Sequence, residues 1–330
     1  MKERVLITGA SGFVGFHLIE AALAKNLEVY AAVRKSSNVA HLQHLPVQFT
    51  YPDFNNIEAL KQELEDKKYN YIIHAAGTTK AKSQDEYNHI NADYTFNLVS
   101  AASQTSGFIK KIVFLSSLAA IGPLNQENKL ITENTTPLPV TAYGRSKLLA
   151  EQKISAIKNV PLITLRPTAV YGPRDKDIFI LFKAINRGLE PYIGRIKQQL
   201  SFVYVKDLAG LAVNAIFAVA VQNQAYNITD GNSYSRYDLA NLSKPLLYKK
   251  TFKFHLPLGA VKVLALALEK TYSFLNKTPA LNREKLNELT AANWICDIEK
   301  ARMELGFRPV YNLQKGLEET MQWYKQEKWL

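Results

Sequence analysis

The first half of the chain alternates short apolar runs with longer segments of helical periodicity. Over 13–25 the apolar residues Leu18, Ile19 and Ala22 recur on one helical face, which predicts a helix that packs against a sheet. Strands are predicted at the apolar runs 4–9, 28–33, 69–76, 111–117 and 161–167, with a weaker one at 46–52. Because these runs are largely continuous in apolar character and are separated by helices, they predict a parallel sheet with both faces covered.

The alternation weakens after Thr168. A short strand and a helix are predicted over 201–221, and a further strand over 225–231. We therefore predict an α/β protein with a doubly wound Rossmann sheet and a smaller, discontinuous C-terminal domain that binds the substrate. The predicted boundaries are 1–167 and 201–231 for the NAD(P)-binding Rossmann domain, and 168–200 and 232–330 for the substrate-binding cap.

The composition is that of a globular protein, with 47% hydrophobic and 21% charged residues among 330. The net charge of +12 is compatible with nucleic acid, anionic lipid or a phosphorylated small molecule as a partner. The lysines are scattered, and no basic stripe is interleaved with aromatic residues. We therefore expect a small-molecule substrate and no nucleic-acid partner.

The longest apolar stretch, 256–268, is interrupted by Lys262 and is shorter than the roughly 20 residues that span a bilayer. We expect no transmembrane segment, and no signal peptide because a strand-like run follows the first few residues directly. The single cysteine, Cys296, excludes an intrachain disulfide and suits a reducing compartment, so we expect a cytoplasmic protein. No His, Cys and Asp cluster has ligand spacing, and we expect no metal.

Three glycines, Gly9, Gly12 and Gly15, lie between the first predicted strand and the first predicted helix. In a dinucleotide-binding turn the first glycine permits a tight turn, the second lets a pyrophosphate approach the backbone, and the third lets the helix pack on the strand. The N–H groups that begin the helix then face the phosphates. The spacing predicts a pyrophosphate site, and the alternative is a turn whose glycines serve packing alone.

The second predicted strand is followed by Arg34 and Lys35, about 20 residues after the glycines. At this position an acidic residue binds the ribose 2′-hydroxyl of NAD, whereas an arginine accommodates the 2′-phosphate of NADP. A guanidinium can hold a phosphate through two parallel hydrogen bonds. We therefore predict NADP as the preferred cofactor, with NAD as the alternative. A solvated basic loop would explain the same residues without a cofactor.

Tyr143 and Lys147 are four residues apart, so they share one face of a helix. A neighbouring ammonium lowers the pKa of a tyrosine, which equips the hydroxyl as an acid or base near neutral pH. Ser116 and Ser117 follow a predicted strand at its carboxyl end, where sites form in such sheets. A serine hydroxyl there can hold a substrate oxygen on which charge develops.

These motifs resemble those of the extended short-chain dehydrogenase/reductases, which include nucleotide-sugar epimerases and dehydratases, dihydroflavonol reductases and 3β-hydroxysteroid dehydrogenases. The resemblance covers nearly the whole chain and is carried by TGASGFVG, YPDF, IIHAAG, HINADYT, VFLSSLAAIG, YGRSK and LRPTAVYGPRD. It implies that Ser117, Tyr143 and Lys147 are catalytic, with Ser117 placed by its distance from Gly122. It implies cofactor contacts from Gly9, Ser11, Gly12, Phe13, Val14, Gly15, Arg34, Lys35, Asp53, Phe54, Ala75, Ala76, Gly77, Asn91, Ser116, Tyr143, Lys147, Pro167 and Val170.

Two departures from the family pattern bear on this assignment. Tyr94 stands where the family often has glycine, which affects the local cofactor contacts, and Ile121 stands where many sugar-modifying members have tyrosine. The segments 91–105 and 143–158 resemble the helices that pair in the family's dimers, so the resemblance implies a homodimer.

The resemblance implies hydride transfer between a nicotinamide and a ketone or secondary alcohol. A nucleotide-sugar epimerase or dehydratase with tightly bound NAD is the enzymatic alternative, and a non-catalytic NAD(P)-sensing protein is the alternative of another class. The resemblance favours an apolar substrate, because Leu200 and Ser201 stand where sugar-modifying relatives commonly have arginine. Arg174, Arg187 and Arg195 keep a site for a nucleotide sugar open.

The cap segment 255–286 resembles the reductase and steroid-dehydrogenase branch of the family. Its apolar residues have three possible places: the wall of a substrate pocket, a peripheral membrane surface, or the core of the cap. The residues concerned are Val261, Leu264, Leu266 and Leu268.

Overall fold

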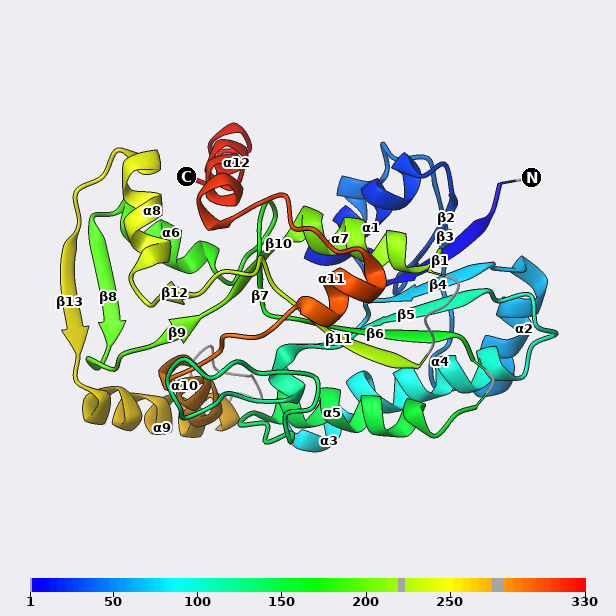
Figure 1. Cartoon of the computed structure of the whole chain (residues 1–330), viewed down its shortest axis with the longest axis horizontal. Helices are drawn as coiled ribbons and strands as arrows, with labels where there is room; N and C mark the ends of the chain where they lie inside the picture. Colours follow the sequence, from blue (N-terminus) through cyan, green and yellow to red (C-terminus); the bar gives the residue numbers. More distant parts are fainter. Residues whose placement is uncertain (1, 159, 219–222, 275–281) are drawn as a thin grey trace.

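A seven-stranded parallel sheet forms the centre of the computed structural model, which describes residues 2–158, 160–218, 223–274 and 282–330 (Figure 1). The strand order is β11-β6-β5-β4-β1-β2-β3. The strands are β1 (Arg4–Thr8), β2 (Glu28–Ala32), β3 (Val47–Thr50), β4 (Tyr71–His74), β5 (Lys111–Leu115), β6 (Leu162–Pro167) and β11 (Gln224–Ile228). Each predicted strand is confirmed, and the fold is the predicted doubly wound Rossmann sheet.

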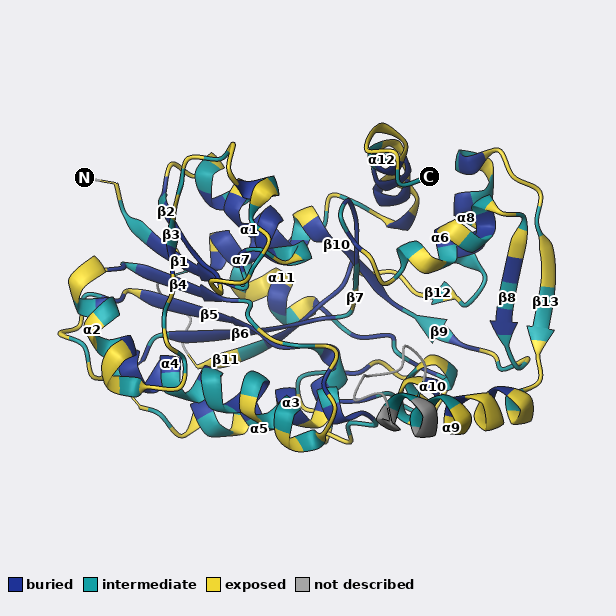
Figure 2. Cartoon of the chain, turned by 180° about the vertical axis from the view of Figure 1, so that it is seen from behind, coloured by how far each residue is buried: buried dark blue, intermediate teal, exposed yellow. Residues whose placement is uncertain are grey.

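Helices cover both faces of the sheet, and the strand residues explain why. Leu6 and Ile7 are neighbours in β1, are both fully buried, and belong to separate apolar clusters on opposite faces. One face is covered by α1 (Phe13–Ala24), α7 (Val205–Ala215) and α11 (Glu299–Leu305), and the other by α2 (Ile57–Lys67), α4 (Tyr94–Ser103) and α5 (Ala142–Ser155) (Figure 1). Colouring by burial shows the strands as the most buried layer (Figure 2).

After β1 the chain forms β2 and β3 on one side of β1, and it then forms β4, β5 and β6 on the other side. β1 pairs with β2 on one side and with β4 on the other. In such sheets a ligand binds where the strand order reverses, outside the carboxyl ends of the strands. β4 and β5 end at His74 and Leu115, earlier than the predicted limits, so the residues that follow them lie beyond this edge.

Short helices at and near this edge carry several of the predicted site segments. They are η1 (Ala40–Leu42), α3 (Gln84–Asn88), the π-helix η2 (His89–Asp93) and η3 (Leu118–Ala120). The predicted helix at 91–105 is thus divided between η2 and α4, and the predicted helix at 143–158 is α5.

The second part of the chain forms a cap beside the sheet (Figure 1). Its core contains Tyr171, Phe182, Leu239, Leu317 and Tyr324. Its strands are β7 (Ala169–Tyr171), β8 (Leu189–Ile193), β9 (Gln199–Leu200), β10 (Phe202–Tyr204), β12 (Tyr234–Ser235) and β13 (Phe252–Leu256), paired as β7 with β10, β9 with β12 and β8 with β13. Its helices are α6 (Phe179–Asn186), α8 (Asp238–Leu247), α9 (Leu258–Phe274), α10 (Arg283–Thr290) and α12 (Leu313–Gln326).

The division of the chain into the two predicted domains stays a prediction. Within the predicted cap segment, α11 packs on the sheet, because Ile298, Ala301 and Phe307 join the apolar cluster of α1 and α7. No helix within the described part of the chain is long and apolar enough to cross a membrane.

Candidate active site

The glycine turn between β1 and α1 is tightly packed and leaves the start of the helix open. Gly9 has a φ of +67°, and a Cβ there would lie 2.7 Å from the Ala75 carbonyl oxygen. A Cβ on Gly15 would lie 2.1 Å from the Gly9 oxygen, so the helix can approach the turn only with glycine here. Gly12 begins α1 without a side-chain cap, and no acidic residue occupies the first turn. This arrangement suits a pyrophosphate beside Ser11, Phe13 and Val14.

A buried chain of hydrogen bonds holds the segment after β4 to the end of β1. The Ala76 backbone N–H donates to Thr8 Oγ1 at 3.0 Å, and Thr8 Oγ1 lies 2.7 Å from His74 Nδ1. His74 Nε2 lies 3.0 Å from Thr95 Oγ1, whose hydroxyl donates to the Asn91 carbonyl oxygen at 2.7 Å. Since Thr95 uses its proton on Asn91, Nε2 of His74 is the protonated nitrogen and Nδ1 accepts from Thr8.

His74 is therefore a satisfied core residue rather than a catalyst. Burial and the nearby Lys147 ammonium lower the pKa of His74 to about 3, so its ring is neutral near neutral pH. The chain of bonds fixes Ala75, Ala76 and the π-helix η2 relative to the glycine turn.

Asn91 lies in the π-helix η2 and is fully buried. Its side-chain oxygen accepts from the Thr78 N–H at 2.7 Å, and its Nδ2 donates to the Thr78 oxygen and to Ser146 Oγ at 3.0 and 2.9 Å. A Cβ on Gly77 would lie 3.0 Å from Asn91 Oδ1 and 3.4 Å from Lys147 Nζ. The structure thus brings Gly77, Asn91 and Lys147 together.

The predicted adenine-side residues lie farther along the same edge. The Phe54 ring stacks on the Tyr94 ring at 5.8 Å, and the Phe54 carbonyl oxygen accepts from Asn97 Nδ2 at 2.8 Å. Asp53 is exposed and its carboxylate accepts from the Asn55 N–H at 3.0 Å. The tyrosine that departs from the family pattern therefore supports Phe54.

Arg34 and Lys35 are exposed just beyond the end of β2. Neither forms an ion pair with any residue that the structure describes. Their charges are thus free to meet a phosphate group at the position where the 2′-phosphate of NADP is expected.

Ser117, Tyr143 and Lys147 meet where β5 ends against α5. The Ser117 side chain lies close enough to the Tyr143 hydroxyl to lower its pKa, and its oxygen accepts from the Ala119 N–H at 3.1 Å. Lys147 Nζ donates to the Leu115 carbonyl oxygen at 2.9 Å and lies 4.9 Å from the centre of the Phe114 ring. The lysine is thereby held at the strand end, on the side of Gly77.

The protonation of this group differs from the expectation that Lys147 lowers the pKa of Tyr143. Burial raises the pKa of Tyr143 to about 12, with the Ser117 hydrogen bond acting in the opposite direction. Burial lowers the pKa of Lys147 to about 8, which the Glu151 carboxylate partly offsets. The Lys147 ammonium donates to the Leu115 carbonyl oxygen and is not among the groups that shift the pKa of Tyr143.

Ser116 has a different set of contacts from Ser117. Its hydroxyl donates to Glu151 Oε1 at 2.5 Å, and the same carboxylate binds the Arg166 guanidinium through Nε and Nη2. Both charged side chains are nearly buried. This ion pair ties the end of β5 to α5 and β6, with Pro167 at the end of β6 and Val170 in β7 directly after it.

A cavity of about 520 Å³ lies between this edge of the sheet and the cap, with Ser117 and Tyr143 in its wall. Its other lining residues are mostly apolar. They include Leu118, Ala119, Pro167, Ala169, Ile178, Leu181, Pro191, Tyr192, Ile193, Leu200, Phe202, Leu239, Leu289 and Trp294.

Two cations line the cavity, and sequence reasoning missed both. Lys285 Nζ pairs with Glu288 at 2.8 Å. The Arg236 guanidinium donates to the Ile193 and Ile196 carbonyl oxygens at 2.9 Å each and lies over the Tyr192 ring. Arg236 follows the short strand β12, where no motif in the sequence signals a pocket residue.

The arginines predicted to serve a nucleotide sugar lie elsewhere in the described structure. Arg174 stacks on Phe16, 3.9 Å from its ring centre, beside a separate cavity of about 330 Å³. Arg187 ends α6, and Arg195 is exposed in the loop after β8. None of the three is among the residues that line the larger cavity.

The apolar residues Val261, Leu264, Leu266 and Leu268 of α9 are not among the residues that line this cavity. Val261 is buried in the cap, and Leu268 is half-buried. Leu264 and Leu266 are exposed to solvent. The lining comes instead from the elements that stand closer to the sheet edge.

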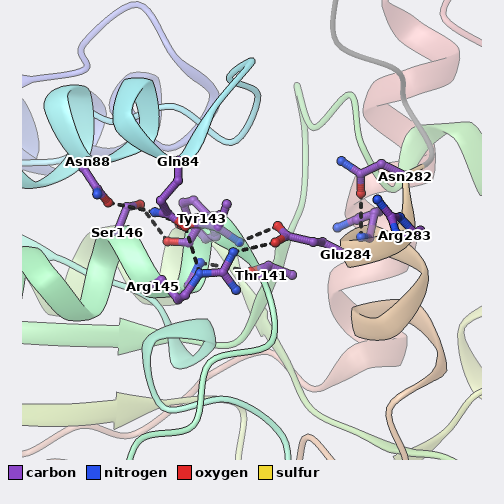
Figure 3. A network of polar contacts seen from close by, with 12 residues as sticks. Gln84, Asn88, Thr141, Tyr143, Arg145, Ser146, Asn282, Arg283 and Glu284 are labelled. Carbon is purple, nitrogen blue, oxygen red and sulfur yellow. Dashed lines mark hydrogen bonds and ion pairs between the residues drawn. The ribbon is translucent and has the colours of Figure 1, made fainter. Parts of the chain in front are cut away.

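The cap is joined to the catalytic helix by Glu284 at the start of α10 (Figure 3). Its carboxylate accepts from the Ala142 backbone N–H and from Arg145 Nη2, each at 2.5 Å. Arg145 Nε also donates to Gln84 Oε1 at 2.8 Å. A carboxylate at the N-terminus of α5 is favourably placed in the field of that helix.

The model of the NAD dependent epimerase/dehydratase family matches residues 5–229 of the chain. A UDP-glucose 4-epimerase of Vibrio cholerae is 26% identical over 99% of this chain and 97% of its own length. A decarboxylating sterol-4-alpha-carboxylate 3-dehydrogenase of Schizosaccharomyces pombe is 26% identical over 98% of each chain.

The fold is also that of a solved UDP-glucose 4-epimerase of Thermotoga maritima in complex with UDP-glucose. The TM-score is 0.80 with 19% identity, over 98% of this chain and 99% of that one. Glycine turn, Ser117, Tyr143 and Lys147 all lie within the segment that the family model matches. The chain therefore belongs to the NAD dependent epimerase/dehydratase family, whose members among its relatives are epimerases, dehydrogenases and reductases.

Proposed function

We propose that the protein interconverts an apolar ketone and the corresponding secondary alcohol, with NADP preferred over NAD. The observation that carries this proposal is the cavity over Ser117 and Tyr143, whose wall is mainly apolar. A diphosphate needs cations with free donors to meet its charge. Lys285 is paired with Glu288, and each terminal nitrogen of Arg236 donates to a carbonyl oxygen. Arg236 keeps further donors, among them Nε, which has no partner among the described residues. A single guanidinium carries only half of the roughly two charges that a diphosphate brings.

The positions of Tyr143 and Ser117 support a route for the proton that reaches the substrate oxygen. The bound nicotinamide would supply or accept the hydride at the carbinol carbon. With a pKa of about 12, the Tyr143 hydroxyl stays protonated at neutral pH, which suits a donor to the oxygen of a ketone under reduction. Ser117 stands beside that hydroxyl in the cavity wall and would hold the same substrate oxygen as negative charge develops.

Lys147 would serve the cofactor and the proton supply together. Its Nζ lies near Gly77 and Asn91, on the side of the predicted nicotinamide ribose. With a pKa lowered to about 8 by burial, it exchanges protons easily near neutral pH. It is therefore suited to restoring the proton that Tyr143 donates.

The second candidate is a nucleotide-sugar epimerase or dehydratase that keeps NAD bound. It is favoured by the UDP-glucose 4-epimerases among the relatives and by the guanidinium of Arg236 in the cavity wall. Thermal unfolding with NADPH present separates the two candidates, because a ligand raises the unfolding temperature by occupying the folded state. We expect a shift with a steroid-like ligand; a shift with UDP and none with any apolar ligand would favour the nucleotide sugar.

We also propose a homodimer formed through α4 and α5, in keeping with the family resemblance. Leu148 and Leu149 of α5 are only half-buried in the single chain. Sedimentation equilibrium should give twice the mass of the chain, and Leu148→Glu should shift the protein to a monomer. The single buried cysteine, Cys296, is consistent with a cytoplasmic location.

A further inference from the structure

Helix α9 is apolar on both its inner and its outer side. Leu258, Val261, Ala265, Leu268 and Tyr272 recur at helical spacing and are buried or half-buried. The residues between them should be polar in an amphipathic surface helix. Instead the outer side exposes 68% of Val263, 52% of Leu264 and 41% of Leu266.

The end of β13 adds a further exposed apolar residue. Leu256, which is 41% exposed, lies two residues before the start of α9. We call Leu256, Val263, Leu264 and Leu266 the α9 face. Figures 1 and 2 show α9 along the outer rim of the cap, away from the sheet.

The α9 face is one helix away from the substrate cavity. α10 packs against α9, and Lys285, Glu288 and Leu289 of α10 line the cavity. Leu289 is itself well exposed, so α10 reaches from the cavity wall to the surface. The helix that carries the α9 face is therefore in direct contact with a helix that forms part of the cavity wall.

Near the α9 face, two charged residues that form no ion pair with a described residue are both positive. Lys262 and Arg195 are exposed and form no ion pair with a described residue. Arg195 follows Gly194, whose N–H donates to the Leu256 oxygen at 2.8 Å. The neighbouring carboxylates are engaged, Glu269 by Arg283 and Glu288 by Lys285.

We propose that the α9 face docks on the surface of an anionic lipid bilayer and that the apolar substrate enters the cavity from that bilayer. The second half of this proposal rests on the proposed function. An exposed apolar helix face flanked by cations matches the interface of anionic lipid, where apolar side chains enter the acyl boundary and cations meet the headgroups. A second copy docked through the same face would instead set Lys262 and Arg195 against their own counterparts, so like charges would meet.

Co-sedimentation with lipid vesicles tests the docking. The protein should bind vesicles of phosphatidylcholine mixed with phosphatidylglycerol and bind pure phosphatidylcholine weakly. Leu264→Gln and Val263→Gln should each weaken binding by about tenfold, because a buried apolar side chain is lost from the interface. Met303→Gln, which changes a 78% exposed side chain on α11, is the matched control and should bind like the wild type.

Three outcomes would overturn the docking proposal. The first is that the protein does not bind anionic vesicles. The second is that Met303→Gln loses as much vesicle binding as Leu264→Gln does. The third is that the protein does not bind vesicles but self-associates, and that Leu264→Gln abolishes the self-association. The last would assign the α9 face to a second copy of the chain.

Activity assays separate this proposal from the proposed function. Leu264→Gln should reduce a water-soluble ketone at the wild-type rate and a vesicle-embedded ketone more slowly. If the protein bound vesicles through the α9 face but reduced no ketone, the proposed function would be overturned, whereas docking of the α9 face on anionic lipid would stand. If the wild type and Leu264→Gln each reduced the water-soluble and the vesicle-embedded ketone at equal rates, only the proposed entry of substrate from the bilayer would be overturned.

Discussion

The sheet edge and the cap share one cavity but hold their side chains in different ways. At the sheet edge Thr8, His74, Thr95 and Asn91 are fully buried, and each is bonded to the next by a hydrogen bond. The cap contributes mainly apolar side chains, and its two cations at the cavity each contact neighbouring groups, Glu288 for Lys285 and backbone carbonyl oxygens for Arg236. Under the proposed function, the comparison assigns the chemistry to the sheet edge and the choice of substrate to the cap.

The largest effect is expected at the sheet edge. Tyr143→Phe should lower the turnover number about 10³-fold, since the proton donor is removed while the ring is kept. Cofactor binding, measured by fluorescence titration, should stay close to wild type. A variant that keeps most of its rate would contradict the assignment of Tyr143 as donor.

The next effect is expected beyond β2, where the cofactor would be selected. Arg34→Ala should raise the KM for NADPH about ten- to hundredfold, as for the loss of a hydrogen bond to a charged group. The KM for NADH should change little, because that cofactor lacks the 2′-phosphate. An equal loss for both cofactors would contradict the preference for NADP.

His74 tests whether the buried chain stabilises the sheet edge. His74→Gln should lower the free energy of unfolding near pH 7 by about 1–3 kcal/mol, because its buried partners lose their hydrogen bonds. His74 has a pKa of about 3 in the folded protein, below its ordinary value, so its contribution is complete above about pH 6.5 and is lost as the pH falls towards 3.

The difference between wild type and His74→Gln should therefore shrink between about pH 7 and pH 5. Urea unfolding at both pH values measures it. A difference that stays constant over this range would mean that His74 is not held neutral by its surroundings.

The smallest effect is expected where the cap meets the catalytic helix. Glu284→Gln should lower the free energy of unfolding by about 0.5–1 kcal/mol, because it removes a partly exposed ion pair and a charge at the N-terminus of α5. Lys285→Gln, one residue along the same helix, removes the other ion pair of α10 as a comparison. A loss of several kcal/mol in Glu284→Gln alone would show that the cap depends on this contact far more than its exposure indicates.

The sheet could be predicted from the sequence because its strands are continuous apolar runs and its turns carry glycines. Gly9 and Gly15 predict that backbone segments approach each other closely. In the structure a Cβ on either glycine would collide with backbone atoms, of Ala75 for Gly9 and of Gly9 for Gly15. Arg236 could not be predicted as a cavity residue, since its position depends on how β12 and α8 pack in the cap rather than on a local pattern. The direction of the pKa shift of Tyr143 was also predicted wrongly. Helical spacing places Lys147 near Tyr143, but it does not show that the Lys147 ammonium donates to the Leu115 carbonyl oxygen.

The outer side of α9 presents the opposite difficulty. Its apolar pattern is consistent with core, pocket and surface, and only tertiary packing separates Val261 from Leu264. Periodicity identifies a helix, but an all-round apolar helix does not reveal which side the rest of the chain will cover.

The most direct test of the account is the transfer of label from the cofactor to an apolar ketone. NADPH that carries deuterium at the transferable position is incubated with the wild-type protein and a steroid-like ketone, and the alcohol is analysed by mass spectrometry. The account predicts deuterium on the carbinol carbon, and none when Tyr143→Phe replaces the wild type. Label transfer to no apolar ketone, together with conversion of a nucleotide sugar without net loss of NADPH, would contradict it.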